Sequence, residues 1–354
     1  MLPLKLILRV FILFPLLVIH SDDALGKKKD RAARDFRHAD INGDKKLDFS
    51  EWNRRGNFER LDRNGDGYLN LKEVRTLYKG HDDKTYSWPP KNMPKPGMEI
   101  DASIEADRVG RQSLDKETLC GISRPRDCDM SHAVLRGLLE TGTGPVFPKK
   151  AVCPGMDDFW AMDYSNKRNR TSYHGGIDLP APWGTPMRAA AAGSVVAIYD
   201  GEGSKRGIEI ILRHSPEQTG LPVWTYTGYG HLDRIPRLKV GQRVKLGQIL
   251  GPTGNSGNSA RGNKQSKTRR PAIHFVVFYS SERQYSENIR TIIPVDGRWM
   301  DPMAFYRQKP PFDSPSVKAL PDKEKGIAIP VLFENGETYP AKTKLVWPYA
   351  CSRD

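Results

Sequence analysis

Residues 152–305 alternate short apolar runs with Gly-rich turns, and this texture constrains the fold more than any other feature of the chain. Four runs are rich in β-branched or aromatic residues, namely SVVAIY (194–199), IEIIL (208–212), VWTYTGY (223–229) and IHFVVFY (273–279). Several short strands at close spacing predict an antiparallel sandwich or barrel rather than a βαβ fold. We therefore expect the central part of the chain to be a mainly β, antiparallel domain.

The N-terminus has the features of a secretory signal. Lys5 and Arg9 precede an apolar run at 10–19, and the small residues Ser21, Ala24 and Gly26 follow it. A basic start, a short apolar segment and a small-residue cleavage zone are typical of such signals. The run is shorter than the roughly 20 apolar residues that a membrane-spanning helix needs. We assign residues 1–26 to the signal and expect an exported, periplasmic or extracellular protein without stable membrane insertion.

The formal net charge of +14 favours acidic polymers as partners. Zinc-finger spacing, an RNP signature and a heptad-linked basic region are all missing from the sequence, so we do not expect nucleic acid to be a partner. Anionic cell-wall material then becomes the acidic polymer of interest.

The four cysteines all follow the predicted signal: Cys120, Cys128, Cys153 and Cys351. An even number in an oxidising compartment predicts two disulfides, but the sequence leaves three pairings open. One option joins Cys120 to Cys128 locally and leaves Cys153 to tie the C-terminal tail to the central domain. The absence of a CxxC pair argues against a thiolate zinc site.

Composition divides the rest of the chain. Residues 27–79 carry two acidic loops, and residues 80–144 contain a Pro-, Lys- and Asp-rich linker (80–115) and a short helix predicted at 131–140. Residues 145–306 form the β domain, and 307–354 form a C-terminal extension with a hairpin candidate at 334–336.

Residues 62–73 (DRNGDGYLNLKE) have the spacing of an EF-hand calcium loop. Gly67 stands at the sixth position, where the loop turns sharply. The expected ligands are Asp62, Asn64, Asp66, the Tyr68 carbonyl, Asn70 and Glu73.

Residues 40–51 (DINGDKKLDFSE) repeat this pattern, so we expect a small α-helical EF-hand domain at the N-terminus. Lys45 replaces the glycine at position six, and a non-Gly residue at positive φ costs on the order of 1 kcal/mol, which predicts a weaker site. Calcium would either hold this domain folded or regulate it, and the steady calcium outside cells favours the first. The expected ligands are Asp40, Asn42, Asp44, the Lys46 carbonyl, Asp48 and Glu51.

Three motifs carry the candidate chemistry: YHGGIDLP with His174 and Asp178, YTGYGHL with His231, and AIHFVVF with His274. Two histidines and one carboxylate are a ligand set of catalytic zinc, which keeps a fourth coordination position open. Gly175 and Gly176 would let the backbone bend tightly between two of the ligands.

All three motifs, in this order, resemble the lysostaphin-type zinc metalloendopeptidases that cut peptide bridges in peptidoglycan. The likeness covers residues 145–306 and includes KVGQRVKLGQILGPTGNSG and the closing DPMAFY. It implies that His174, Asp178 and His274 bind zinc, that His231 assists catalysis and that peptidoglycan is the substrate.

The sequence departs from this family at the closing H-x-H motif, where Ala272 replaces the first histidine. General base assistance contributes about 10²–10⁴-fold to a rate, so its loss would give a slow or silent enzyme unless His231 substitutes. A non-catalytic protein that binds the wall or regulates another hydrolase is therefore the alternative. A calcium-dependent adhesion or scaffold protein is a third possibility.

Two further features have weaker implications. The stretch between Gly257 and Pro271 is rich in Lys and Arg and contains no acid, so it would favour an anionic substrate if it borders the cleft, or would be a solvated loop. We interpret His214, at the end of an apolar run, as structural.

Overall fold

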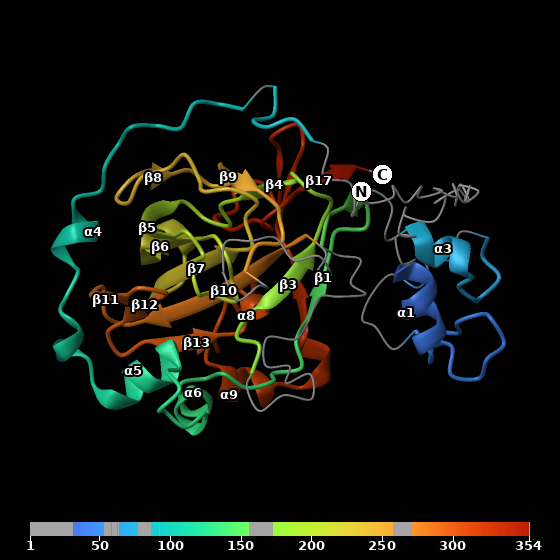
Figure 1. Ribbon diagram of the computed structural model, residues 1–354, viewed down its shortest axis with the longest axis horizontal. Helices are drawn as coiled ribbons and strands as arrows, with labels where there is room; N and C mark the ends of the chain where they lie inside the picture. The colour runs from blue at the N-terminus through green and yellow to red at the C-terminus, as the bar shows by residue number, and fades with distance from the viewer. Residues whose placement is uncertain are drawn as a thin grey trace, which may run out of the picture.

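A computed structural model of the chain describes residues 31–52, 58, 62, 64–76, 86–91, 93–155, 173–257 and 271–353. A seven-stranded sheet runs in the order β13-β10-β7-β6-β5-β8, with β3 paired to β10 off this path (Figure 1). All its pairings are antiparallel, and the four predicted strand runs are confirmed. Its strands are β3 (Ile177–Pro180), β5 (Gly193–Tyr199), β6 (Glu209–His214), β7 (Trp224–Gly230), β8 (Arg243–Val244), β10 (Ala272–Ser280) and β13 (Arg298–Met300).

Smaller sheets surround this one. Two antiparallel pairs are β4 (Pro186–Arg188) with β9 (Ile249–Pro252) and β11 (Tyr285–Asn288) with β12 (Thr291–Pro294). A parallel pair joins β1 (Gly144–Val146) to β14 (Gly326–Ala328). A four-stranded sheet has the order β16 (Thr338–Tyr339), β15 (Val331–Phe333), β17 (Ala350–Arg353) and β2 (Ala151–Val152).

The described helices are short. The helix predicted at 131–140 ends at Leu135, because Gly137 takes a positive φ of 96° that breaks the helical path. The helices are α1 (Arg31–Ala39), α3 (Leu71–Thr76), α4 (Ser103–Ala106), α5 (Lys116–Ser123), α6 (Ser131–Leu135), α7 (Pro216–Thr219), α8 (Pro302–Tyr306) and α9 (Ser314–Lys318), with 3-10 turns η1 (Arg111–Ser113) and η2 (Asp322–Glu324).

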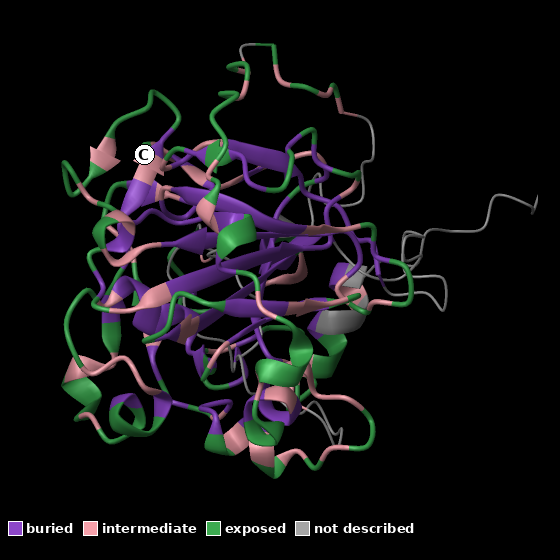
Figure 2. Cartoon of the chain, turned by 90° about the vertical axis from the view of Figure 1, so that its left-hand side faces the viewer, coloured by how far each residue is buried: buried purple, intermediate pink, exposed green. Residues whose placement is uncertain are grey.

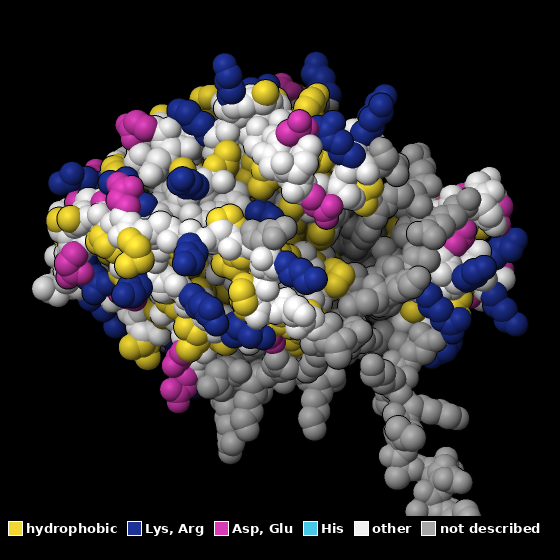
Figure 3. All heavy atoms as spheres, turned by 90° about the horizontal axis from the view of Figure 1, so that it is seen from above, with side chains coloured by type: hydrophobic (Ala, Val, Ile, Leu, Met, Phe, Trp, Pro, Cys, Tyr) yellow, Lys and Arg dark blue, Asp and Glu magenta, His cyan; other side chains and the backbone are white. Residues whose placement is uncertain are grey.

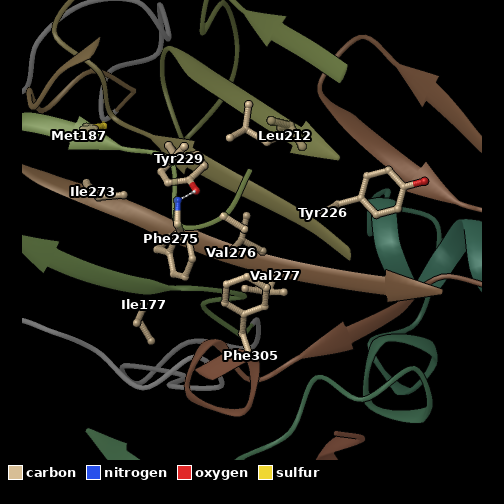
Figure 4. Close-up of a cluster of buried hydrophobic side chains, with 14 of the residues drawn as sticks. Ile177, Met187, Leu212, Tyr226, Tyr229, Ile273, Phe275, Val276, Val277 and Phe305 are labelled. Carbon is tan, nitrogen blue, oxygen red and sulfur yellow. Dashed lines mark hydrogen bonds between the residues drawn. The ribbon is translucent and has the colours of Figure 1, made fainter. Parts of the chain in front are cut away.

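The core of the β domain is built around β10, whose residues are nearly all buried (Figure 2). On one face of this strand, Phe275 packs against Tyr229 of β7 with ring centroids 5.4 Å apart, and against Phe305 of α8 at 6.5 Å (Figure 4). Because side chains alternate along a strand, Ala272, His274 and Val276 occupy the opposite face. The packing of Phe275 on one face of β10 therefore fixes the direction in which His274 points from the other face.

The segment read as a linker at 80–115 packs onto the sheet from Gly97 onward, so that part of the prediction is wrong. Asp107 and Arg213 of β6 form an ion pair at 2.9 Å with both side chains almost fully buried. The Ile104 carbonyl accepts a hydrogen bond from the Tyr285 hydroxyl at 2.6 Å. Polar anchors of this kind leave no hydrophobic periodicity in the sequence, which is why composition indicated a linker.

The C-terminal extension likewise belongs to the main core. Trp347 and Tyr349 are fully buried in the same hydrophobic cluster as the sheet, and the predicted hairpin forms between β15 and β16. The two disulfides are Cys120–Cys128 and Cys153–Cys351, the pairing that ties the tail to the β domain. The boundary at 307 therefore does not separate two independent cores.

Replacing Cys351 by serine is expected to lower the free energy of unfolding by about 2–5 kcal/mol, because Cys153–Cys351 closes a 198-residue loop. Urea denaturation of the purified protein measures this change. Cys128→Ser is the matched control, since its loop spans only 8 residues and its loss should cost less. An equal cost for both variants would contradict the loop-length argument.

A second, separate core joins the two acidic loops. Phe36, Trp52 and Phe58 pack there with Leu47, Leu69 and Val74, and Figure 1 shows α1 and α3 beside the β-rich part. Leu47 and Leu69 exchange backbone hydrogen bonds at 2.9 and 2.8 Å, so the loops lie side by side. The predicted signal at 1–26 lies outside the described residues. Within the part that is described, no helix has the length and apolar character needed to cross a membrane.

Candidate metal centre

The three residues predicted to bind a metal converge in the structure. Asp178 on β3 pairs with His274 on β10, so both side chains point to the same face of the sheet. Asp178 Oδ1 lies 3.2 Å from His274 Nδ1 and 3.3 Å from His174 Nε2. A tetrahedral zinc site with bonds of about 2 Å separates its ligands by roughly 3.3 Å, so these donors fit the ion.

The protonation of the site also suits a metal. His274 is buried, and this burial lowers the pKa of its imidazole to about 4, so the ring is neutral at pH 7 and keeps a lone pair for a ligand bond. His174 Nδ1 is buried without a hydrogen-bond partner among the described residues. A donor set of two imidazoles and one carboxylate, all within 4.8 Å of one another, therefore fits zinc.

Two glycines leave the space that the ligands need. Gly175 has a φ of 76°, and a Cβ there would lie 2.8 Å from Arg124 Nη2. A Cβ on Gly176 would lie 2.6 Å from His274 Cε1 and 2.7 Å from its Nε2. These two positions explain why the first motif carries the HGG sequence.

Gly176→Ala is expected to displace the His274 ring and to weaken zinc binding by about 10–100-fold, as loss of ligand support typically does. Competition with a chromogenic chelator measures the zinc dissociation constant. Gly336→Ala is the control, because a Cβ there meets no atom within 4 Å and the residue lies far along the tail hairpin, although its φ of 89° makes the change strained. Equal zinc affinity in the Gly176→Ala and wild-type proteins would contradict the packing argument.

His231 joins this group from the end of β7. Its ring centroid lies 5.7 Å from that of His274, and its backbone takes a φ of 64°. Nδ1 lies 2.7 Å from the Ser256 carbonyl oxygen, which can only accept, so Nδ1 carries the proton and Nε2 the lone pair of the neutral ring. The structure thus brings together all four residues that the sequence selected for zinc chemistry.

Two other sequence interpretations can be located. Ala272 lies two residues before His274 on the same face of β10 and is buried. The position at which the family resemblance implies a histidine therefore contributes no imidazole to the site. His214 is fully buried, with Nδ1 2.6 Å from the Ala192 carbonyl and Nε2 2.7 Å from Thr227 Oγ1. Burial lowers the pKa of His214 to about 4, which agrees with a structural, uncharged residue.

Sequence reasoning missed two arginines beside the site. Arg124 donates from Nη1 to the Tyr173 carbonyl at 2.9 Å and lies 4.9 Å from the Trp299 ring centroid, so it supports the backbone just before His174. Arg206 accepts the His231 N–H at its own carbonyl, at 2.7 Å. The one available signal was Glu209, the partner of Arg206, which is an acid inside the apolar run IEIIL.

The basic stretch at 258–270 lies outside the described residues, but both its ends border the site. Gly257 packs against Gly207, where a Cβ on Gly257 would lie 2.2 Å from the Gly207 nitrogen. Pro271 at the other end accepts the Ala181 N–H at 3.3 Å and precedes Ala272. Arg261, Lys264, Lys267, Arg269 and Arg270 fall between these ends.

The model of peptidase family M23 matches residues 172–286, a span that contains all four site residues. Residues 172–286 form an M23 peptidase domain. Six of the seven strands of the main sheet, all except β13, lie within this span.

Solved structures give further likenesses to the M23 domain. The catalytic domain of the prophage-encoded M23 protein EnpA from Enterococcus faecalis, as an alanine-to-histidine mutant, is 26% identical. This match covers 38% of the present chain and 85% of that one, with a TM-score of 0.26. The catalytic domain of lysostaphin from Staphylococcus simulans is 29% identical over 31% of this chain and 71% of that one, with a TM-score of 0.24. No curated protein matches the chain.

The two acidic loops form outside the M23 domain. In the first, carboxylate oxygens of Asp40, Asp44 and Glu51 lie within 4.8 Å of one another, and Lys45 takes the expected positive φ of 64°. In the second, Asp62 accepts the Gly67 N–H at 2.8 Å and Glu73 accepts the Asn70 N–H at 3.0 Å. Both loops therefore turn their acidic side chains inward.

Proposed function

We propose that the protein is a zinc-dependent endopeptidase that cleaves peptide bonds in peptidoglycan. The observation that carries this proposal is the convergence of two imidazoles and one carboxylate, with His231 beside them, on an M23 peptidase domain. His174, Asp178 and His274 would hold the ion. Zinc in such a site supplies Lewis acidity, which polarises a carbonyl oxygen and acidifies water.

His231 is the residue of this chain that would move the proton. Its Nδ1–H is held by the Ser256 carbonyl, so the basic Nε2 has a fixed direction. Nε2 would accept a proton from the water that attacks the peptide carbonyl, and the resulting imidazolium would donate that proton to the leaving amine as the C–N bond breaks. The charged ring also stabilises the oxyanion that forms at the carbonyl.

Three features support peptidoglycan as the substrate: the resemblance to lysostaphin-type enzymes, the predicted secretory signal and the net charge of +14. The test incubates the zinc-loaded protein with purified peptidoglycan and follows release of soluble muropeptides. A zinc chelator should stop the release and added zinc should restore it. No release in any condition would rule out the peptidase proposal.

A second candidate function is a weakly active or inactive protein that binds or regulates at the cell wall. Ala272 favours it, because the family's additional imidazole is missing. This alternative predicts that the wild-type protein co-sediments with peptidoglycan and cleaves it slowly or not at all, and that Ala272→His creates or accelerates hydrolysis. Cleavage by the wild-type protein at a rate that Ala272→His does not raise would exclude it.

We further propose that the two acidic loops form an EF-hand pair that binds calcium and stabilises the N-terminal domain. The ligand spacing, the inward carboxylates and the Leu47–Leu69 bridge support this. Isothermal titration should show calcium binding that Glu73→Gln weakens more than Glu51→Gln does. If calcium only stabilises the N-terminal domain, muropeptide release should stay unchanged when calcium alone is removed. If the protein acts in adhesion, it should instead bind a partner in a calcium-dependent way.

A further inference from the structure

The basic residue Arg206 lies beside the candidate metal centre, and its backbone is hydrogen-bonded to that of His231. Arg206 lies in the turn between β5 and β6, and its carbonyl accepts the His231 N–H at 2.7 Å. A Cβ on Gly230, which pairs with His274, would lie 3.4 Å from the Arg206 Cβ and 3.2 Å from the His274 Cβ. The Arg206 side chain therefore starts next to the strand position that faces His274.

The guanidinium is held from two sides. Its Nε forms an ion pair with Glu209 Oε2 at 3.2 Å, and its Nη2 donates to the Arg290 carbonyl oxygen. Among the described residues, Nη1 has no such partner, and the Arg206 side chain remains 18% exposed. A planar guanidinium fixed at one edge and open at another is already oriented for an incoming carboxylate.

Glu209 holds Arg206 from within the sheet. Ile210 pairs with Tyr229, which places Glu209 beside Gly230 and on the same row as His274. The glycines of β7 make room for the carboxylate, since a Cβ on Gly228 would lie 3.0 Å from Glu209 Oε1. Glu209 is 1% exposed, and burial of a carboxylate costs free energy unless a cation accompanies it. The buried Glu209 carboxylate therefore holds the Arg206 guanidinium in place.

The spacing along this row sets what Arg206 can reach. Neighbouring strands lie about 4.8 Å apart, so the Glu209 backbone is roughly 10 Å from that of His274. An extended peptide advances about 3.3–3.6 Å per residue. A substrate with its scissile bond at the metal centre would therefore place a group two or three residues away near the Arg206–Glu209 pair.

The surroundings add to the positive charge. Arg290 is exposed, and its backbone carbonyl lies beside the Arg206 guanidinium. Figure 3 shows Lys and Arg side chains on one face of the molecule, interspersed with acidic and hydrophobic ones. An acidic group would therefore be attracted to this end of the site before Arg206 binds it.

We propose that Arg206 binds a carboxylate of the substrate two or three residues from the scissile bond, with Glu209 as its positioning residue. The inference rests on the proposed peptidase function and narrows the substrate to acidic peptides. Charge-assisted hydrogen bonds of this kind change affinity by about 10–100-fold.

The experiment compares soluble muropeptides with the same muropeptides whose carboxylates are coupled to methylamine through a carbodiimide. Release of new amino groups gives kcat and KM for both. Fluorescence anisotropy of labelled muropeptides gives dissociation constants with the chelator-treated protein, in which no turnover occurs. The variants are Arg206→Gln, Arg206→Lys, Glu209→Gln and the charge-matched control Lys205→Gln.

The wild-type protein should prefer the carboxylate form by about 10–100-fold in both measurements. Arg206→Gln should remove the preference by raising KM and the dissociation constant for the carboxylate form alone. Arg206→Lys should keep part of it, Glu209→Gln should reduce it, and Lys205→Gln should keep it. Circular dichroism confirms that each variant is folded.

The outcomes separate this inference from the proposed function. Hydrolysis of both substrates with an unchanged preference in Arg206→Gln would overturn the inference and leave the peptidase proposal standing. An equal fall in kcat for both substrates would assign Arg206 to the oxyanion instead and would also overturn it. If neither substrate is hydrolysed, the dissociation constants alone decide for or against the inference, and the peptidase proposal fails.

Discussion

His274→Ala is expected to remove zinc from the protein and to reduce muropeptide release to the uncatalysed background. The buried imidazole supplies one of three ligand atoms that lie within 4.8 Å of one another, and the two that remain cannot form a closed site. The zinc content, measured by mass spectrometry of the dialysed protein, should fall from about one ion per chain to a small fraction of that.

Val276→Ala is the control for this change. Val276 lies two residues further along β10, on the same face and fully buried, so its truncation also leaves a cavity in the strand. This variant should lose stability but keep its zinc and its activity. If His274→Ala retained a full complement of zinc, the ligand assignment would be wrong, and with it the proposed chemistry.

His231→Ala should lower kcat by about 10²–10⁴-fold while the zinc content stays at the wild-type value. The residue is the one imidazole near the ligands, among the described residues, that the ligand set does not use, and Ala272 provides no second. The pH dependence of kcat should lose its acidic limb, since that limb reports protonation of the catalytic base.

A histidine away from the site provides the comparison for His231. His132 lies on α6, and His132→Ala should leave kcat and zinc content unchanged. A fall in kcat of less than tenfold for His231→Ala would show that another group moves the proton. A matching loss of zinc would instead make His231 a ligand.

Much of the site could be predicted from sequence because its residues lie in short motifs. His274 lies in a predicted strand, and the alternation of side chains along a strand determines which face it takes. Asp178 lies on β3, a strand that the sequence analysis did not predict. The tight HGG turn could also be predicted, because glycine has no Cβ and so tolerates both the positive φ and the close contacts found there.

The rest depends on contacts between distant segments. The Asp107–Arg213 ion pair joins residues 106 positions apart, and the sequence around either residue does not indicate which residue it pairs with. Glu209 stood out within an apolar run, but its pairing with Arg206 across a turn and its position beside Gly230 required the fold. Hydrophobic periodicity reports burial of apolar faces and is silent about polar anchors.

The burial of residues 97–115 and of the C-terminal tail has a practical consequence for dissecting this molecule. Cutting at residue 145 would leave Arg213 as a buried cation without Asp107, and cutting at 306 would expose the surfaces that Trp347 and Tyr349 cover. Unpaired buried charge and newly exposed aromatic surface both promote unfolding and aggregation. The smallest fragment that retains its own interior therefore begins near Gly97 and runs to the last residues, well beyond the 172–286 span that family likeness marks.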